Sequence, residues 1–127
     1  MRISKAFWDE LVAHARDEAP NECCGVARLA DGRVEEVFRG RNERASPYAF
    51  DLDFESLKRA NDLDEQGTAV AVYHSHVRSD AEPSEQDRNV VNYPHWLYLI
   101  VSLKGDPHVR AWRVVNGHFE EENLELE

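Results

Sequence analysis

The sequence of 127 residues lacks a long apolar run and has few basic side chains. No stretch of about 18 apolar residues occurs, so we expect no transmembrane helix. With 15 Lys and Arg against 25 Asp and Glu, the formal net charge is -10, which argues against a nucleic-acid binder and against electrostatic attachment to an anionic membrane. The N-terminal segment also lacks the apolar core of a signal peptide, so the expected location is the cytoplasm.

Cysteine is almost absent as well. The two cysteines, Cys23 and Cys24, are neighbours, and adjacent cysteines seldom bridge each other because the geometry is strained. We therefore expect a fold without disulfides, as is usual in a reducing compartment. The sequence also has no Cys-x-x-Cys pair, which zinc-dependent deaminases use to bind their metal.

No internal repeat, low-complexity tract or linker interrupts the chain, so its length predicts one domain, residues 1–127. Two short segments are almost entirely apolar and predict strands buried on both faces, at 68–73 and 96–103. Further strands are expected at 24–30, 34–38, 48–52 and 109–115, and helices at 4–18, 54–66 and 84–91. This order predicts an α/β (α+β) fold with a mixed central sheet flanked by helices.

Local signals set several boundaries of these elements. Ser4 and Asp53 are the expected N-caps of the first two helices. Asp31-Gly32 predicts a tight hairpin between two strands. After the turn at Asn116-Gly117 the sequence predicts an acidic tail.

The strongest chemical signal is the pair His74 and His76 at the end of the apolar strand 68–73. Residues i and i+2 of an extended chain project to the same face, so both imidazoles can approach one metal ion. Asp87 follows eleven residues later, and the intervening loop can return its carboxylate to the histidines. Two imidazoles and one carboxylate suit zinc and leave a fourth position for water, whose pKa zinc lowers to about 7.

These residues also have structural interpretations. Ser84-x-x-Asp87 after a proline is close to a capping box, in which Ser84 is the N-cap. A capped first turn would hold Asp87 in place, so capping and metal binding are compatible. Cys24 with one of the histidines is an alternative nucleophilic pair, but it competes with zinc for the same imidazoles.

A water-activating metal site also needs a carboxylate that moves protons without binding the metal. Glu22 lies in the run Pro-Asn-Glu-Cys-Cys-Gly at the entry to the expected strand 24–30. Its small and apolar neighbours predict a partly desolvated side chain, which raises the pKa of a carboxyl group. On these grounds alone, Glu22 is one candidate among many acidic residues.

Together these residues resemble the JAMM (MPN-plus) zinc metalloprotease family. The family pattern is Glu…His-Ser/Thr-His-Pro-x(6)-Ser-x-x-Asp, and the sequence matches its spacing with Glu22, His74, His76, Ser84 and Asp87. The resemblance covers essentially the whole chain, in the manner of a small stand-alone prokaryotic form.

The resemblance implies an MPN-like fold of cytidine-deaminase-like architecture, with zinc bound by His74, His76 and Asp87. It further implies that Glu22 is the general acid/base and that Ser84 helps to stabilise the oxyanion. The implied activity is that of a peptidase or isopeptidase that cuts an amide bond at the C-terminus of a ubiquitin-like sulfur-carrier protein. The alternative is a non-catalytic module that holds zinc and binds such a partner.

One position departs from the family pattern. Val77 stands where the family usually has proline. Proline would stiffen the loop between the ligands, so its absence is expected to loosen this loop and leaves the ligand set unchanged. Segment 39–44 is locally basic and is expected to be a solvated loop or a partner contact, and segment 78–80 is a candidate for steering substrate. The other histidines are expected on the surface or in loops: His14, His95, His108 and His118.

Overall fold

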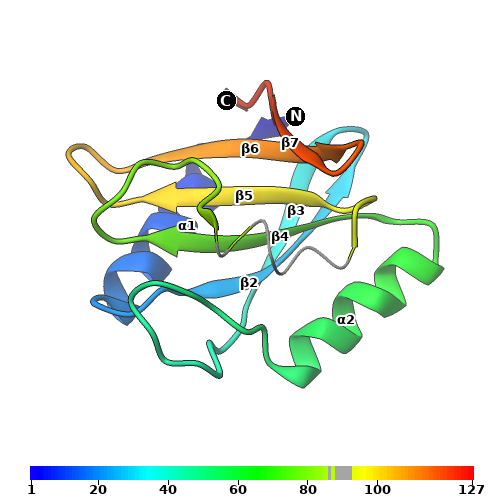
Figure 1. The fold of residues 1–127 in the computed structure, drawn as a ribbon. Helices are drawn as coiled ribbons and strands as arrows, with labels where there is room; N and C mark the ends of the chain where they lie inside the picture. Colours follow the sequence, from blue (N-terminus) through cyan, green and yellow to red (C-terminus); the bar gives the residue numbers. More distant parts are fainter. Residues whose placement is uncertain (86, 88–92) are drawn as a thin grey trace.

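The computed structural model describes residues 1–85, 87 and 93–127. Its helices are α1 (Lys5–Glu18) and α2 (Phe54–Glu65), and its strands are β1 (Arg2–Ile3), β2 (Cys24–Ala30), β3 (Arg33–Arg39), β4 (Ala69–His76), β5 (Leu97–Ser102), β6 (His108–Val115), β7 (His118–Glu122) and β8 (Glu125–Leu126). The strands form one sheet in the order β7-β6-β5-β4-β2-β3-β1-β8. The pairs β4–β5, β1–β3 and β1–β8 are parallel, and the others are antiparallel. The expected mixed α/β fold is confirmed (Figure 1).

β4 is apolar along most of its length because both of its faces are covered. Val72 belongs to the core cluster that contains Ala60 of α2, whereas Tyr73 belongs to the cluster that contains Leu11 of α1. Successive side chains of a strand point to opposite faces. The same alternation places the two histidines of β4 on the face covered by α2, and the serine between them on the face covered by α1.

The predicted helix caps and hairpin are present. Ser4 Oγ accepts the Phe7 N–H at 3.3 Å, and the Asp53 carboxylate accepts the Ser56 N–H at 3.2 Å. The hairpin between β2 and β3 turns at 31–32, where both residues have positive φ. The sequence signals for these boundaries are therefore confirmed.

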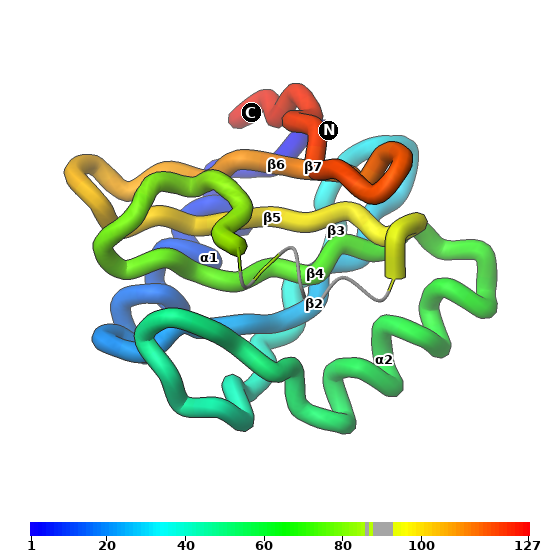
Figure 2. Tube along the Cα trace, in the orientation of Figure 1, coloured from blue at the N-terminus to red at the C-terminus, as the bar shows by residue number. Residues whose placement is uncertain are grey.

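The segment after residue 117 is acidic, as predicted, but it is not a tail, because it forms strands at the sheet edge. β7 pairs antiparallel with β6, and its acidic side chains meet arginines of that strand: Arg110 lies 2.7 Å from Glu121 and Arg113 lies 3.3 Å from Glu122. β8 pairs with β1, so the two ends of the chain lie side by side (Figure 2). Ion pairs across strands replace the apolar alternation that normally identifies a strand.

The predicted strand 48–52 is also wrong. Apart from a single bridge between Asn42 and Leu52, the main chain of this segment forms hydrogen bonds with the side chain of Asn42 and not with a neighbouring strand. By contrast, β4 continues through His76, beyond its predicted end. The predicted helix 84–91 lies mostly outside the described residues.

His14 was expected on the surface, and the structure corrects this. The side chain is 2% exposed, and its Nδ1 lies 2.7 Å from the hydroxyl of Tyr73. His14 follows Leu11 by three residues on α1, so both project toward the sheet. Burial lowers the pKa of His14, which favours a neutral imidazole in the core.

Gly25 lies where β2 and β4 approach closely, directly opposite Tyr73. A Cβ atom at this position would lie 2.5 Å from the main-chain oxygen of Phe38 and 2.5 Å from the Tyr73 ring. We expect Gly25→Ala to lower the free energy of unfolding by about 3 kcal/mol, because the strand backbone cannot yield without loss of pairing. Urea denaturation measures this. The exchange Ala69→Gly at the exposed start of β4 is the control and should cost at most about 1 kcal/mol; equal losses would contradict the prediction.

Candidate metal centre

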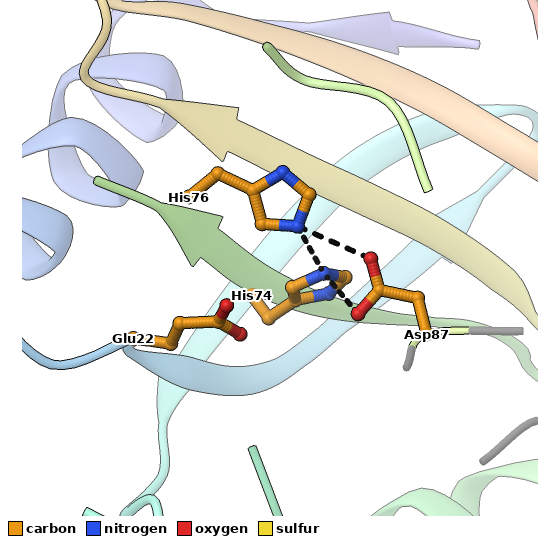
Figure 3. A group of neighbouring side chains, drawn as sticks. All are labelled: Glu22, His74, His76 and Asp87. Carbon is orange, nitrogen blue, oxygen red and sulfur yellow. Dashed lines mark hydrogen bonds and ion pairs between the residues drawn. The ribbon is translucent and has the colours of Figure 1, made fainter. Parts of the chain in front are cut away.

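The end of β4 brings His74 and His76 to the face where Glu22 and Asp87 meet them (Figure 3). All four side chains are buried, and each offers a ligand atom such that these atoms lie within 4.8 Å of one another. Glu22 precedes β2, and Asp87 belongs to the connection between β4 and β5. Three separate segments therefore place the sequence-predicted residues in one group.

The spacing within this group fits a divalent metal ion. Nε2 of His74 lies 3.2 Å from Nε2 of His76. Oδ1 of Asp87 lies 3.1 Å from Nε2 of His74, and Oδ2 of Asp87 lies 3.1 Å from Nε2 of His76. Zinc binds nitrogen and oxygen at about 2.0–2.2 Å in tetrahedral geometry, which separates the ligand atoms by about 3.3 Å. The donor types and their separations suit one ion shared by the three residues.

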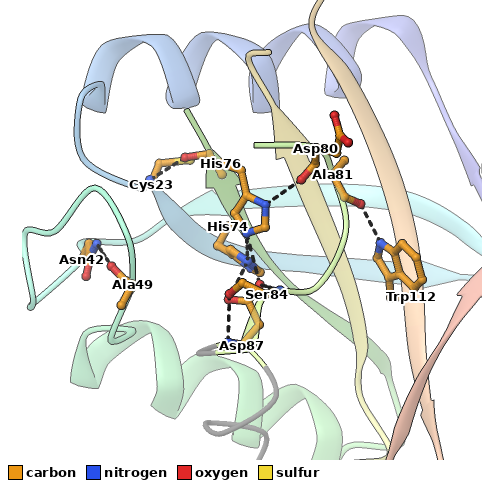
Figure 4. A network of polar contacts seen from close by, with 11 residues as sticks. Cys23, Asn42, Ala49, His74, His76, Asp80, Ala81, Ser84, Asp87 and Trp112 are labelled. Atoms are coloured by element: carbon orange, nitrogen blue, oxygen red, sulfur yellow. Dashed lines mark hydrogen bonds and ion pairs between the residues drawn. The ribbon is translucent and has the colours of Figure 1, made fainter. Parts of the chain in front are cut away.

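Contacts outside the group orient the imidazoles. The main-chain oxygen of Asp80 lies 2.7 Å from Nδ1 of His76 (Figure 4), so Nδ1 donates to this oxygen and Nε2 is the nitrogen left to bind a metal ion. The ring of Phe50 stacks on His74 with centroids 4.5 Å apart. The hydrogen bond thus orients the ring of His76, and the stacking contact supports the ring of His74.

Ser84 and Asp87 form the reciprocal arrangement that their spacing predicts. The Ser84 N–H donates to Asp87 Oδ2 at 2.8 Å, and the Asp87 N–H donates to Ser84 Oγ at 3.2 Å. These are the bonds of a capping box, and they hold the carboxylate toward the histidines. Most of the segment that would continue from this turn lies outside the described residues.

Burial is the largest influence on the pKa of each group here. It lowers the pKa of His74, which favours the neutral, ligating form. At His76 the hydrogen bonds to Asp87 and to the Asp80 carbonyl outweigh burial and raise the pKa. At Asp87 burial is likewise outweighed by the hydrogen bonds from the histidines, so its pKa lies well below the usual range. Asp87 is therefore an anion in a buried site.

Glu22 is 3% exposed, and its Oε1 has no hydrogen-bond partner among the described residues. This burial is the expected desolvation, and it raises the pKa of the Glu22 carboxyl group to about 8. Its main-chain N–H donates to the Ser46 oxygen at 2.9 Å, and its main-chain oxygen accepts from the side chain of Asn42 at 3.0 Å. The backbone is thus held while the carboxyl group faces the centre.

No sequence pattern singled out Asn42, although it organises the loop that supports Glu22. Its Nδ2 also donates to the Ala49 oxygen at 2.9 Å, and its Oδ1 accepts the Asp51 N–H at 3.0 Å. Asparagine often bonds to nearby backbone in turns, but that tendency does not distinguish this residue from others in polar loops. Phe50, which stacks on His74, was also missed, because no sequence pattern distinguishes it from other aromatic residues.

The chain matches the family model for prokaryotic homologs of the JAB domain over residues 4–115. The protein belongs to this family. It is 40% identical over 125 residues to the CysO-cysteine peptidase of Mycobacterium tuberculosis (strain ATCC 25618 / H37Rv), covering 91% of this chain and 84% of the relative. It is 36% identical over 118 residues to the desampylase of Haloferax volcanii, covering 82% and 81%.

Solved structures agree with this JAB-family assignment. Protein DSY2949 from Desulfitobacterium hafniense is 30% identical and superposes with a TM-score of 0.83, covering 99% of this chain and 92% of the other. AF2198, a JAB1/MPN domain protein from Archaeoglobus fulgidus, shares the fold with a TM-score of 0.64 at 18% identity, covering 100% and 96%. The predicted family and its MPN-like fold are confirmed.

The cysteines of this JAB-family protein are packing residues. Both thiols are free and buried. Ser75 Oγ accepts the Cys23 N–H at 2.8 Å, on the face opposite the histidines, as the strand alternation predicts. Burial raises the pKa of Cys23 to about 12 and the pKa of Cys24 even further. The thiolate that a Cys24 nucleophile requires is therefore strongly disfavoured.

We expect both thiols of the native protein to resist Ellman's reagent at pH 7.5. Reaction requires thiolate, and a pKa of about 12 for Cys23 should slow it at least about 100-fold relative to an ordinary cysteine. Time-resolved absorbance of the released thiol measures the rate. The same protein unfolded in guanidinium should react quickly at two sites, and fast reaction before unfolding would contradict the buried placement.

Segment 39–44 of the JAB-family protein is not a free basic patch. Each of its arginines has a carboxylate partner: Arg39 pairs with Glu10 and Asp17, Arg41 with Glu43, and Arg44 with Asp51. The positive charges are thus neutralised locally.

The helices of the described residues include none with the length and apolar character needed to cross a membrane.

Proposed function

We propose that this protein is a zinc-dependent peptidase or isopeptidase that hydrolyses an amide bond at the C-terminus of a ubiquitin-like, sulfur-carrier-type protein. The observation that carries this proposal is the buried group of Glu22, His74, His76 and Asp87, in a chain 40% identical to a CysO-cysteine peptidase. His74, His76 and Asp87 are the proposed zinc ligands. A cytoplasmic location and a single domain over residues 1–127 stay predictions.

A zinc ion held here would supply a Lewis acid for the amide carbonyl and make water easier to deprotonate. In the proposed reaction Glu22 takes a proton from water as the water oxygen adds to the carbonyl carbon. When the C–N bond breaks, the same carboxyl group gives that proton to the leaving nitrogen. The products are a carrier with a new C-terminal carboxyl group and a free amine. The burial of Glu22 supports this role, because it brings the pKa of the carboxyl group toward neutrality.

Ser84 is proposed to help stabilise the oxyanion that forms at the substrate carbonyl. Its hydroxyl oxygen accepts the Asp87 N–H at 3.2 Å, and that bond uses an acceptor lone pair of the hydroxyl group. The O–H is still available to donate. Capping the turn and donating to substrate are therefore compatible roles for one side chain.

The surroundings of Glu22 favour catalysis over the alternative of a zinc-holding module without turnover. Its Oε1 has no hydrogen-bond partner in the described part of the chain, and burying a carboxyl group without partners costs free energy. A binding module gains nothing from such a group beside its ligands. A proton-transfer catalyst requires it.

The test uses zinc-loaded protein and a ubiquitin-fold sulfur-carrier protein whose C-terminal Gly-Gly is extended by cysteine. Intact-mass spectrometry should show loss of the cysteine residue, and protein stripped with a chelator is the control. A second carrier, joined through Gly-Gly to a lysine side chain, tests isopeptidase activity. Absence of cleavage of both carriers by folded, zinc-loaded protein would overturn the proposed function.

A further inference from the structure

Two of the cavities lined by described residues lie near the segments that carry the proposed catalytic centre. One lies on the α2 side and is lined largely by apolar and aromatic side chains, including Phe50, Val72 and Trp96; it reaches the centre where Phe50 stacks on His74. The other has a volume of about 230 Å³ and is lined by Pro20, Pro47, Tyr48, Val77, Arg78 and Ser79. The two share none of these lining residues, so they offer different surroundings to the two sides of a scissile bond.

The second cavity is built by the neighbours of Glu22 and His76. Pro20 precedes Glu22 by two residues, and Val77 directly follows His76. Pro47 follows Ser46, whose main-chain oxygen accepts the Glu22 N–H at 2.9 Å. These chain neighbours place the cavity beside the segment that carries Glu22, whereas the aromatic cavity adjoins His74.

The proposed proton path decides which part of the substrate each cavity receives. Glu22 must deliver its proton to the leaving nitrogen, so the leaving group lies on the Glu22 side. The carrier tail, which provides the carbonyl, then approaches from the other side. This assignment rests on the proposed function and places the leaving group in the cavity of about 230 Å³.

We propose that this cavity holds a single amino acid as leaving group, and that the guanidinium of Arg78 binds its free α-carboxylate. Cavities that take drug-sized ligands measure about 300–1,000 Å³, so the smaller volume suits one residue. Proline side chains at 20 and 47 form part of its wall, and Tyr48, 68% exposed, stands at its rim. Arginine matches a carboxylate with two parallel hydrogen bonds.

The charge around Arg78 supports this role. The residue is exposed, and the described residues show no ion pair for it, in contrast to the paired arginines of segment 39–44. The nearby carboxylate of Asp80 lies 3.5 Å from Lys104. The net charge of the chain is -10. An arginine that has no carboxylate partner among the described residues therefore favours an anionic group in this cavity.

The proposal separates two classes of amide substrate. A single amino acid joined through its α-nitrogen presents a free carboxylate two bonds from the scissile nitrogen. A lysine joined through its side chain places its α-carbon several bonds farther away, and within a protein its carboxyl group is already in a peptide bond. We therefore expect this enzyme to trim one C-terminal residue in preference to cutting an isopeptide bond.

The experiment compares two carriers that differ only in the charge of the leaving group. Both end in Gly-Gly-Ala, one as the free acid and one as the carboxamide; alanine avoids a thiol that would itself bind zinc. The value of kcat/KM is measured by mass spectrometry for zinc-loaded wild type, Arg78→Ala, Arg78→Lys and Arg16→Ala. Arg16 is the matched control, because it is exposed on α1 and lies outside the lining of the cavity.

Wild type and Arg16→Ala should cleave the acid at least about 10-fold faster than the carboxamide, as expected for one charge-assisted hydrogen-bonded pair. Arg78→Ala should cleave both carriers at similar rates, and Arg78→Lys should keep part of the preference. A wild-type ratio near one, or equal losses on both carriers in Arg78→Ala, would overturn the assignment while leaving the proposed function intact. Cleavage of neither alanine carrier by wild type that still cleaves the cysteine-extended carrier would overturn this inference alone, whereas failure on the cysteine-extended and lysine-linked carriers overturns the proposed function.

Discussion

Exchange of Glu22 for glutamine should lower kcat about 10³-fold and leave the zinc content unchanged. Glutamine has nearly the same shape but cannot take up and release a proton, and general acid/base catalysis contributes about 10²–10⁴-fold. The rate is measured on the carrier with a C-terminal cysteine, and zinc is measured by elemental mass spectrometry. Separation of turnover from metal binding is the signature of a proton shuttle.

Glu18→Gln is the matched control, because Glu18 is an exposed glutamate at the end of α1. It should retain wild-type turnover. Undiminished cleavage by Glu22→Gln would remove Glu22 from the mechanism. Loss of zinc in that variant would make the carboxyl group a ligand instead, which its position within 4.8 Å of the other donors would permit.

Exchange of His76 for alanine should abolish stoichiometric zinc binding. The site then keeps two protein donors, too few for the three that catalytic zinc sites commonly use. In wild type, zinc at 100 times its dissociation constant stabilises the fold by about 2.7 kcal/mol, which corresponds to a rise in Tm of about 10 °C. Thermal unfolding of the variant should not respond to zinc.

His118→Ala is the control for this experiment, because His118 is exposed at the start of β7. It should bind one zinc ion and show the full rise in Tm. Asp87→Asn provides a second site variant if His76→Ala fails to fold. One zinc ion bound per chain in both site variants would show that the metal lies elsewhere.

The central strands were predictable because a short, almost wholly apolar run has few alternatives to a strand covered on both faces. β4 and β5 fit this description, and the cores on both sides of the sheet explain it. β7 was not predictable, since its edge position rests on ion pairs with β6. Segment 48–52 carries apolar residues but bonds to one asparagine side chain, a contact that hydrophobic periodicity does not record.

The site residues likewise divide into those whose place the sequence predicts and those whose place it does not. The spacing of His74 and His76 along an extended strand is enough to predict their common face, and the reciprocal bonds of Ser84 and Asp87 follow from their separation. The sequence neighbours of Glu22 made it one candidate among many acidic residues, and the family resemblance singled it out. The cavity beside it depends on proline residues at 20 and 47 meeting Val77, and no local pattern connects those positions.

The pairing of β2 with β4 has a consequence for how the centre is acquired. Cys24 lies opposite His74, and the Cys23–Ser75 bond joins residues 52 positions apart. A slip of one residue between these strands would turn Glu22 toward α1. The three proposed ligands come from the single stretch 74–87, whereas Glu22 joins them only through this non-local pairing, which is slow to form. During refolding, turnover should therefore return together with the global fold, after the helices have formed.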